Sequence, residues 1–148
     1  MQGWKEKLLS QAGKEVMIKV VIQSIPTYSM SVFRLPIGLL KDIEAMIQKF
    51  WWGCLENSKK IHWVKWETLC SSKSVGGMGF RDLRVFNDAM LGKQVWRLFH
   101  VRNSLVFKVL QAKYFPSGNI FDAEIPLRFS FAWRSILQAH EGVLRGAR

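Results

Sequence analysis

The chain has 148 residues, of which 49% are hydrophobic and 22% charged, a composition typical of a globular protein and not of a disordered one. We expect no membrane span, because no apolar run reaches roughly 18–20 residues, and no disulfide framework or zinc site, because two cysteines and three scattered histidines supply neither pattern. The formal net charge of +11 and the pI of about 10.1 favour a polyanionic partner.

The first predicted helix covers residues 11–25. Glu15, Lys19 and Gln23 recur at four-residue spacing and form a narrow polar stripe, whereas nearly every other residue from Val16 onward is apolar. We therefore expect this helix to be mostly buried, with only the polar stripe facing water.

Local signals mark the expected helix ends. Ser10 is a predicted N-cap for the first helix, and Asp82 is suited to the same role farther along the chain. Either Asn103 or Ser104 is expected to cap the helix that follows them. A second helix is predicted to start at Pro36 and to stop at Gly53. The connector before Pro36 is short, so the first two helices could pack as an antiparallel pair.

The middle of the chain is less regular. Residues 61–66 and 79–86 are the only arguable strands, and residues 67–70 indicate a single helical turn. The glycines of residues 76–79 lack the spacing of a phosphate-binding loop, so we interpret them as a tight turn.

Three more helices are predicted, over residues 87–100, 104–115 and 130–144. Lys93, Arg97 and His100 would share one face of the first of these. The expected fold class is all-α or nearly so, with five to six helices and at most one short strand pair.

No constellation of residues marks an active site. The three histidines have no serine, cysteine or aspartate partner in a triad-like pattern, and Asp82 and Asp88 are better explained as capping and surface-pairing residues than as a metal or acid–base pair. We expect no catalytic residue, no metal and no cofactor.

Positive charge gathers in residues 57–113, which carry eleven Lys/Arg against three acids. Tryptophans lie among these cations, and basic residues interleaved with aromatic ones are typical of a nucleic-acid-binding face. A solvated basic surface and buried core tryptophans are the alternatives. The candidate nucleic-acid-binding residues are Lys59, Lys60, Lys65, Lys73, Arg81, Arg84, Lys93 and Arg97, and the candidate stacking residues are Trp63, Trp66 and Trp96.

Several stretches resemble the plant LINE-type (non-LTR) retrotransposon reverse transcriptases, in the region just after the polymerase palm. They cover nearly the whole chain in the family's order: residues 9–36, Phe-Trp-Trp-Gly at 50–53, Ile-His-Trp-Val-Lys-Trp-Glu-Thr-Leu-Cys at 61–70, Gly-Gly-Met-Gly-Phe-Arg-Asp-Leu at 76–83, residues 86–97, residues 112–116 and residues 131–137. Similar short stand-alone reading frames occur in plant nuclear and mitochondrial genomes.

The resemblance implies a division into residues 1–56, a thumb-like helical pair, and residues 57–148, a basic, Trp-rich helical connection region, within one continuous folded unit. The family's catalytic Tyr-x-Asp-Asp palm motif is absent from the sequence. The chain is therefore expected to be a non-catalytic fragment of an RNA-directed DNA polymerase that retains weak, sequence-independent binding of RNA or an RNA–DNA hybrid.

The alternative is a structural or protein-interaction module, or a decayed retroelement remnant without a selected activity. In that case the expected partner is a reverse transcriptase palm in trans, or a second copy of the chain. The N-terminus has no apolar core like that of a signal peptide, so we expect an intracellular protein with no membrane partner. Both the nucleus and the mitochondrion stay open as its compartment.

Overall fold

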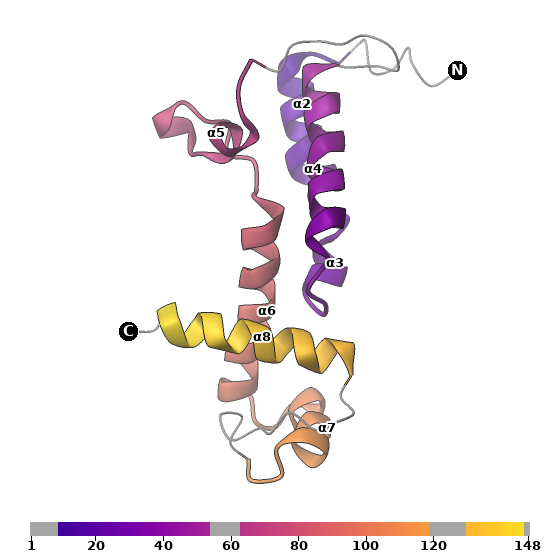
Figure 1. Cartoon of the computed structure of the whole chain (residues 1–148), viewed down its shortest axis with the longest axis vertical. Helices are drawn as coiled ribbons and strands as arrows, with labels where there is room; N and C mark the ends of the chain where they lie inside the picture. The colour runs from indigo at the N-terminus through magenta and orange to yellow at the C-terminus, as the bar shows by residue number, and fades with distance from the viewer. Residues whose placement is uncertain (1–8, 54–62, 119–129, 147–148) are drawn as a thin grey trace, which may run out of the picture. The chain divides into compact units, whose positions relative to one another are not determined.

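The computed structural model describes residues 9–53, 63–118 and 130–146, with side chains described up to residue 139. Within these ranges the regular structure is helical and contains no strand, which confirms the all-α class (Figure 1). The strands considered at residues 63–66 and 79–86 are therefore not formed. Ile61 and His62 lie outside the described residues. None of the described helices is long and apolar enough to cross a membrane.

The helices belong to two compact units. Unit 1 comprises Met1–Tyr28 and Leu35–Phe86, and unit 2 comprises Ser29–Arg34 and Asn87–Arg148. Each unit consists of residues that contact one another more than they contact the other unit. The division into residues 1–56 and 57–148 follows the family resemblance and stays a prediction.

Unit 1 is built on two helical stretches that pack against each other. The first is α2 (Gln11–Met17) followed by the π-helical turn η1 (Ile18–Ile22), and the second is α4 (Ile37–Trp52) (Figure 1). The Ser10 hydroxyl accepts a hydrogen bond from the Gly13 amide at 3.2 Å, which confirms the predicted N-cap. Gly53 ends α4 with a φ of 65°, as its position indicated.

The orientation predicted for the first helix is wrong. Gln23, expected to face water, is 1% exposed, whereas Val16 and Val20, expected to be buried, are 60% and 64% exposed. The η1 turn explains part of the difference, because the Gln23 amide donates to the Ile18 carbonyl five residues earlier at 2.9 Å. Ile18 and Gln23 therefore share one buried side, which a 3.6-residue period does not predict.

The inward polar stripe is compensated by partners elsewhere in unit 1. The Glu15 carboxylate pairs with Lys19 at 2.8 Å and with Lys73 at 2.7 Å. The Gln23 side-chain amide donates to the Arg81 carbonyl at 3.4 Å. These contacts lower the cost of turning polar groups away from water. Several apolar side chains of α2 and η1, among them Val16 and Val20, are left exposed.

Phe80 lies at the aromatic centre of unit 1. Its ring is 5.3 Å from Trp51 of α4 in an edge-on arrangement and 5.7 Å from Trp66 in a stacked one. Trp66 is the first residue of α5 (Trp66–Cys70), the short helix expected at residues 67–70. The Lys19 ammonium lies 5.9 Å from the Phe80 ring centre. Four of the stretches that carry the family resemblance therefore meet at this ring, including the stretch that contains Phe80 itself.

The glycine-rich segment is a tight turn that follows α5 and the 3₁₀ turn η2 (Lys73–Val75). The amides of Met78 and Phe80 both donate to the Leu69 carbonyl, at 3.0 and 3.2 Å. A Cβ atom at Gly77 would lie 2.0 Å from the Ser71 carbonyl oxygen, so no larger residue fits there. The interpretation as a turn is confirmed.

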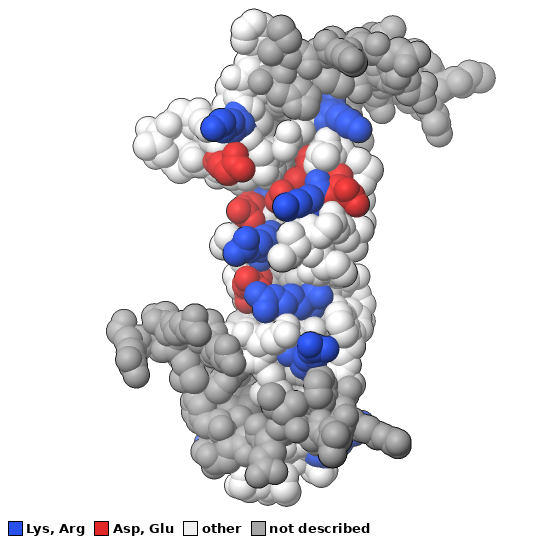
Figure 2. All heavy atoms as spheres, viewed as in Figure 1, with Lys and Arg blue, Asp and Glu red and all other residues white. Residues whose placement is uncertain are grey.

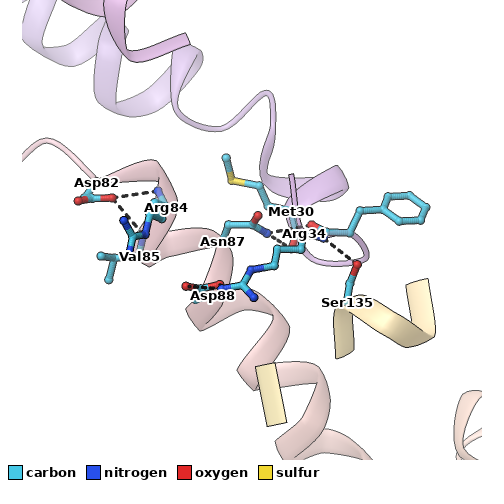
Figure 3. A network of polar contacts seen from close by, with 9 residues as sticks. Met30, Arg34, Asp82, Arg84, Val85, Asn87, Asp88 and Ser135 are labelled. Atoms are coloured by element: carbon cyan, nitrogen blue, oxygen red, sulfur yellow. Dashed lines mark hydrogen bonds and ion pairs between the residues drawn. The ribbon is translucent and has the colours of Figure 1, made fainter. Parts of the chain in front are cut away.

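The helix α6 (Leu83–His100) begins four residues earlier than predicted and starts in unit 1. The Asp82 carboxylate accepts hydrogen bonds from the Arg84 and Val85 amides at 2.9 and 3.0 Å, as its expected role as a cap requires (Figure 3). A second carboxylate, from Glu44 of α4, accepts from the Leu83 amide at 3.2 Å. Both carboxylates occupy the position that the helix dipole favours for negative charge.

Unit 2 has its core between α6, α7 (Leu105–Tyr114) and α8 (Phe131–Gly146). Of the two caps considered for α7, Ser104 is the one that occurs, because its hydroxyl accepts from the Phe107 amide at 3.2 Å. Trp133 is fully buried, with the Tyr114 ring stacked at 4.7 Å and the Phe115 ring at 5.6 Å. The buried core residues are Leu91, Val95, Leu98, Phe107, Tyr114, Phe115, Trp133, Ile136 and Ala139.

The segment Ser29–Arg34, which includes the end of the short helix α3 (Thr27–Met30), is tied into unit 2 by two buried polar side chains. The Asn87 amide of α6 donates to the Met30 and Phe33 carbonyls at 2.8 and 2.9 Å. The Ser135 hydroxyl of α8 accepts from the Arg34 amide at 3.0 Å (Figure 3). We refer to Asn87 and Ser135 with these partners as the 29–34 clamp.

We predict that Gly77→Ala destabilises the protein by about 3 kcal/mol or more, because the added methyl group meets backbone oxygens that cannot rotate away. The matched control is Gly38→Ala in α4, where an added Cβ meets nothing within 4 Å. It should stabilise the protein by about 0.5 kcal/mol through helix propensity. Urea denaturation measures both. Equal effects of the two substitutions would contradict the turn geometry.

Two glutamates of unit 1, Glu44 and Glu15, should contribute to stability with opposite dependence on pH. Burial raises the pKa of Glu44 above its usual value of 4.5, and the hydrogen bond from Leu83 offsets this only in part. The folded state therefore holds this proton more tightly than the unfolded state, and stability falls as pH rises above 4.5. The ion pairs with Lys19 and then Lys73 lower the pKa of Glu15, so its contribution is lost as pH falls below 4.5.

We predict that Glu44→Gln becomes progressively more stable than the parent as pH rises above 4.5, because the amide accepts the Leu83 hydrogen bond without a buried charge. Glu15→Gln should become progressively less stable than the parent over the rise from below pH 4.5 to neutrality. Denaturation curves across this range test both substitutions. A difference from the parent that does not change with pH would refute the assigned environments.

Candidate nucleic-acid interface

The candidate basic residues of unit 1 that the structure describes are exposed, but two of them already have partners. Lys73 forms the ion pair with Glu15, and the Arg81 guanidinium lies 4.7 Å from the centre of the Phe86 ring. Lys65 stands directly before α5, and Arg84 lies in the first turn of α6. Lys59 and Lys60 lie outside the described residues.

The candidate residues of unit 2 form a line along the exposed side of α6. Lys93, Trp96, Arg97 and His100 follow one another at intervals of three, one and three residues, which places them within about 100° of the helix circumference. All four are exposed. We call them the α6 stripe. The stripe predicted from Lys93, Arg97 and His100 is therefore confirmed as a surface feature.

The opposite side of α6 explains why this stripe faces outward. Leu91, Val95 and Leu98 are buried in the core of unit 2 and lie about half a turn away from the stripe. Burying them fixes the rotation of the helix about its axis. The apolar positions therefore determine which polar side chains reach solvent.

Within the described part of unit 2, positive side chains far outnumber negative ones. Among the side chains of unit 2 that the structure describes, Asp88 is the only acidic one, and it pairs with Arg34 at 3.1 Å. Figure 2 shows one face of the molecule, on which acidic groups lie among lysines and arginines. The described cations of unit 2 are Arg34, Lys93, Arg97, Arg102, Lys108, Lys113 and Arg134.

The three candidate stacking tryptophans have different environments. Trp66 is 8% exposed and stacks on Phe80, so it belongs to the core and we remove it from the candidate surface. Trp63 is 76% exposed, and Trp96 is 59% exposed. The Trp96 ring lies 4.3 Å from the His100 ring with an angle of 29° between their planes. Sequence reasoning grouped His100 with the cations and missed this ring pair, although the i, i+4 spacing indicates it.

The described part of the chain contains a free cysteine, Cys70, but no cluster of metal-ligating side chains. No group of three or more metal-ligating side chains occurs among its residues. Burial, followed by the negative charge of Asp82, raises the pKa of the Cys70 thiol to about 12. At neutral pH this thiol is protonated and is a poor nucleophile. The α6 stripe is therefore a stronger candidate site than Cys70.

Comparison with known proteins finds relatives in one plant. No family model and no solved structure matches the chain. Over 124 residues it is 43% identical to "Uncharacterized mitochondrial protein AtMg00310" of Arabidopsis thaliana, a match that covers 83% of this chain and 80% of that protein. Over 139 residues it is 42% identical to "Putative ribonuclease H protein At1g65750" of the same species, a match that covers 92% of this chain.

The second match occupies only 22% of the longer protein, so the chain spans about a fifth of that relative. Both relatives are plant proteins and agree with the plant retroelement origin that the sequence motifs indicate, although neither is named as a reverse transcriptase. Identity at this level over most of both chains establishes kinship with the shorter relative. The chain belongs to the family of the Arabidopsis mitochondrial protein AtMg00310.

Proposed function

We propose that the chain is a non-catalytic, retroelement-derived module that binds RNA or an RNA–DNA hybrid through the nucleic-acid backbone. The observation that carries this proposal is the exposed α6 stripe on a unit whose described side chains include seven cations and one acid. Phosphates attract such a surface without regard to base sequence, and the release of their counterions supplies much of the affinity.

The finer part of the proposal is descent from a LINE-type reverse transcriptase, from the region that follows the palm. The motif order supports it, and so does the match to a segment of a longer protein whose name denotes a nucleic-acid enzyme. A helical module at that place would hold template and product while another domain catalyses synthesis. The mitochondrial name of the shorter relative makes the mitochondrion the first compartment to examine.

The geometry of the α6 stripe suits phosphate contact. Lys93 and Arg97 are one helical turn apart, about 6 Å along the axis, which is close to the spacing of neighbouring phosphates on an extended strand. Arginine can bind a phosphate through two parallel hydrogen bonds, and lysine acts as a compact point charge. In an A-form duplex such contacts read shape and not sequence.

We predict that affinity for an RNA–DNA hybrid falls with salt, with a slope of about −5 in log K against log [salt] if about six phosphates are neutralised. Lys93→Gln combined with Arg97→Gln should bring the slope to about −3, because two contacts are lost. The control pair Lys41→Gln and Lys49→Gln removes the same charge from exposed positions of α4 and should change the slope less.

Fluorescence anisotropy with a labelled hybrid, measured across a salt series, supplies these slopes. A parental slope near zero would contradict the proposal. Equal slopes for the two double variants would remove the α6 stripe as the contact surface and leave only a general attraction by net charge.

A second candidate function, protein interaction, is favoured by a different surface. Val16, Met17, Val20 and Val21 form an exposed apolar strip on α2 and η1, where sequence reasoning expected burial. Contiguous exposed apolar side chains of this kind mark interaction sites or aggregation liabilities. The partner would be a reverse transcriptase palm in trans or a second copy of this chain.

We predict that Val16→Gln combined with Val20→Gln leaves the free energy of unfolding within about 0.5 kcal/mol of the parent, because both side chains already face solvent. If this surface mediates self-association, the double variant should sediment as a monomer at concentrations at which the parent associates. The contrasting control is Ile18→Gln, a fully buried position, which should destabilise the protein severely. A large loss of stability in the Val16/Val20 variant would contradict the observed orientation of the helix.

A further inference from the structure

The Trp96–His100 pair has a geometry that phosphate binding does not require. The His100 Nδ1 atom lies 3.1 Å from the Trp96 carbonyl oxygen. A carbonyl oxygen can only accept, so Nδ1 carries the proton and the hydrogen bond holds the imidazole in place. The imidazole stacks on the indole at 4.3 Å. The indole is therefore supported on one side while more than half of its surface stays in solvent.

Other tryptophans show what a structural role looks like in this protein. Trp51, Trp66 and Trp133 are all less than a tenth exposed and contact other aromatic rings of their own units. Trp96 lies on the side of α6 away from the core residues Leu91, Val95 and Leu98. Its large apolar surface is thus available to a ligand.

The groups beside the indole are cationic. Lys93 precedes Trp96 by three residues and Arg97 follows it directly, and both side chains are exposed. The acidic side chain of unit 2 that the structure describes, Asp88, is five residues before Lys93 and is paired with Arg34. A ligand with a flat ring flanked by negative charge matches this arrangement.

We propose, on the basis of the nucleic-acid binding inferred above, that the Trp96–His100 pair is a stacking platform for one unpaired base of single-stranded RNA or DNA. Lys93 and Arg97 hold the phosphates on either side of that base. In a duplex the faces of interior bases are covered by their neighbours, so only an unpaired or terminal base can reach the indole. Each base presents a π face, and the platform therefore does not select a sequence.

The test compares three labelled ligands: a single strand of about 12 nucleotides, an abasic strand of the same length and charge, and a duplex whose two ends are both closed by non-nucleotide linkers, so that it has no unpaired or terminal base face. The parent protein should bind the intact strand about tenfold more tightly than the abasic one, since stacking of one base contributes about 1–3 kcal/mol. Trp96→Ala should bind both strands equally, at the abasic level. Its affinity for the closed duplex should stay within about twofold of the parental value.

Two further variants separate the platform from general effects. Trp96→Phe keeps an aromatic face and should keep most of the preference for the intact strand. Lys93→Gln combined with Arg97→Gln should weaken the binding of all three ligands, because it removes phosphate contacts. It should preserve the preference for the intact strand, because the Trp96 and His100 rings remain. Parallel RNA and DNA strands should respond alike. If Trp96→Ala lost affinity only for the RNA strand, Trp96 would contact the 2′-hydroxyl and not a base, and the proposal would be overturned.

The outcomes distinguish the two levels of inference. If Trp96→Ala binds every ligand as the parent does, the stacking platform is refuted and backbone binding stands. If the folded parent binds none of the ligands, nucleic-acid binding itself is refuted. Circular dichroism of each variant verifies that it is folded, and Trp96 is exposed enough for its replacement to leave the core intact.

Discussion

The arrangement of unit 2 depends on the buried side-chain amide of Asn87. It donates two hydrogen bonds, to the carbonyls of Met30 and Phe33, and so attaches a segment more than fifty residues earlier in the chain to α6. Ser135 of α8 completes the attachment by accepting from the Arg34 amide, 101 residues away in sequence. Removing the Asn87 side chain would leave the buried Met30 carbonyl without this donor, at a cost of about 1–3 kcal/mol. The bonds to the Phe33 carbonyl and from the Arg34 amide are partly buried, so losing either one should cost less. The 29–34 clamp therefore joins parts of the chain that hydrophobic contact alone would not hold in one register.

This constraint bears on function because the helix that carries Asn87 also carries the α6 stripe. Leu91, Val95 and Leu98 hold one side of α6 in the core, and Lys93 and Trp96 lie on the other. A site on a packed helix is held more precisely than one on a loop. The stretches that resemble a reverse transcriptase also supply the 29–34 clamp and the aromatic centre around Phe80. Those motifs therefore report packing in this chain.

The sequence correctly predicted the structural features that depend only on neighbouring residues. The caps at Ser10, Asp82 and Ser104 and the stop at Gly53 depend on neighbouring residues, and each occurs as expected. The exposed face of α6 followed from an undisturbed 3.6-residue period. The first helix was misjudged because its π-helical turn shifts the period, and because Gln23 finds its partner, the Arg81 carbonyl, far along the chain. Such partners leave no local signal.

The most direct test of the account is to map the contact surface by two-dimensional ¹⁵N NMR as a single-stranded oligonucleotide is added. The account predicts chemical-shift changes at the amides of Lys93, Arg97 and His100 and at the Trp96 indole N–H, while Val16 and Val20 on α2 and η1 stay unchanged. Changes confined to α2 and η1, or spread evenly over the basic residues of both units, would contradict a nucleic-acid site on α6.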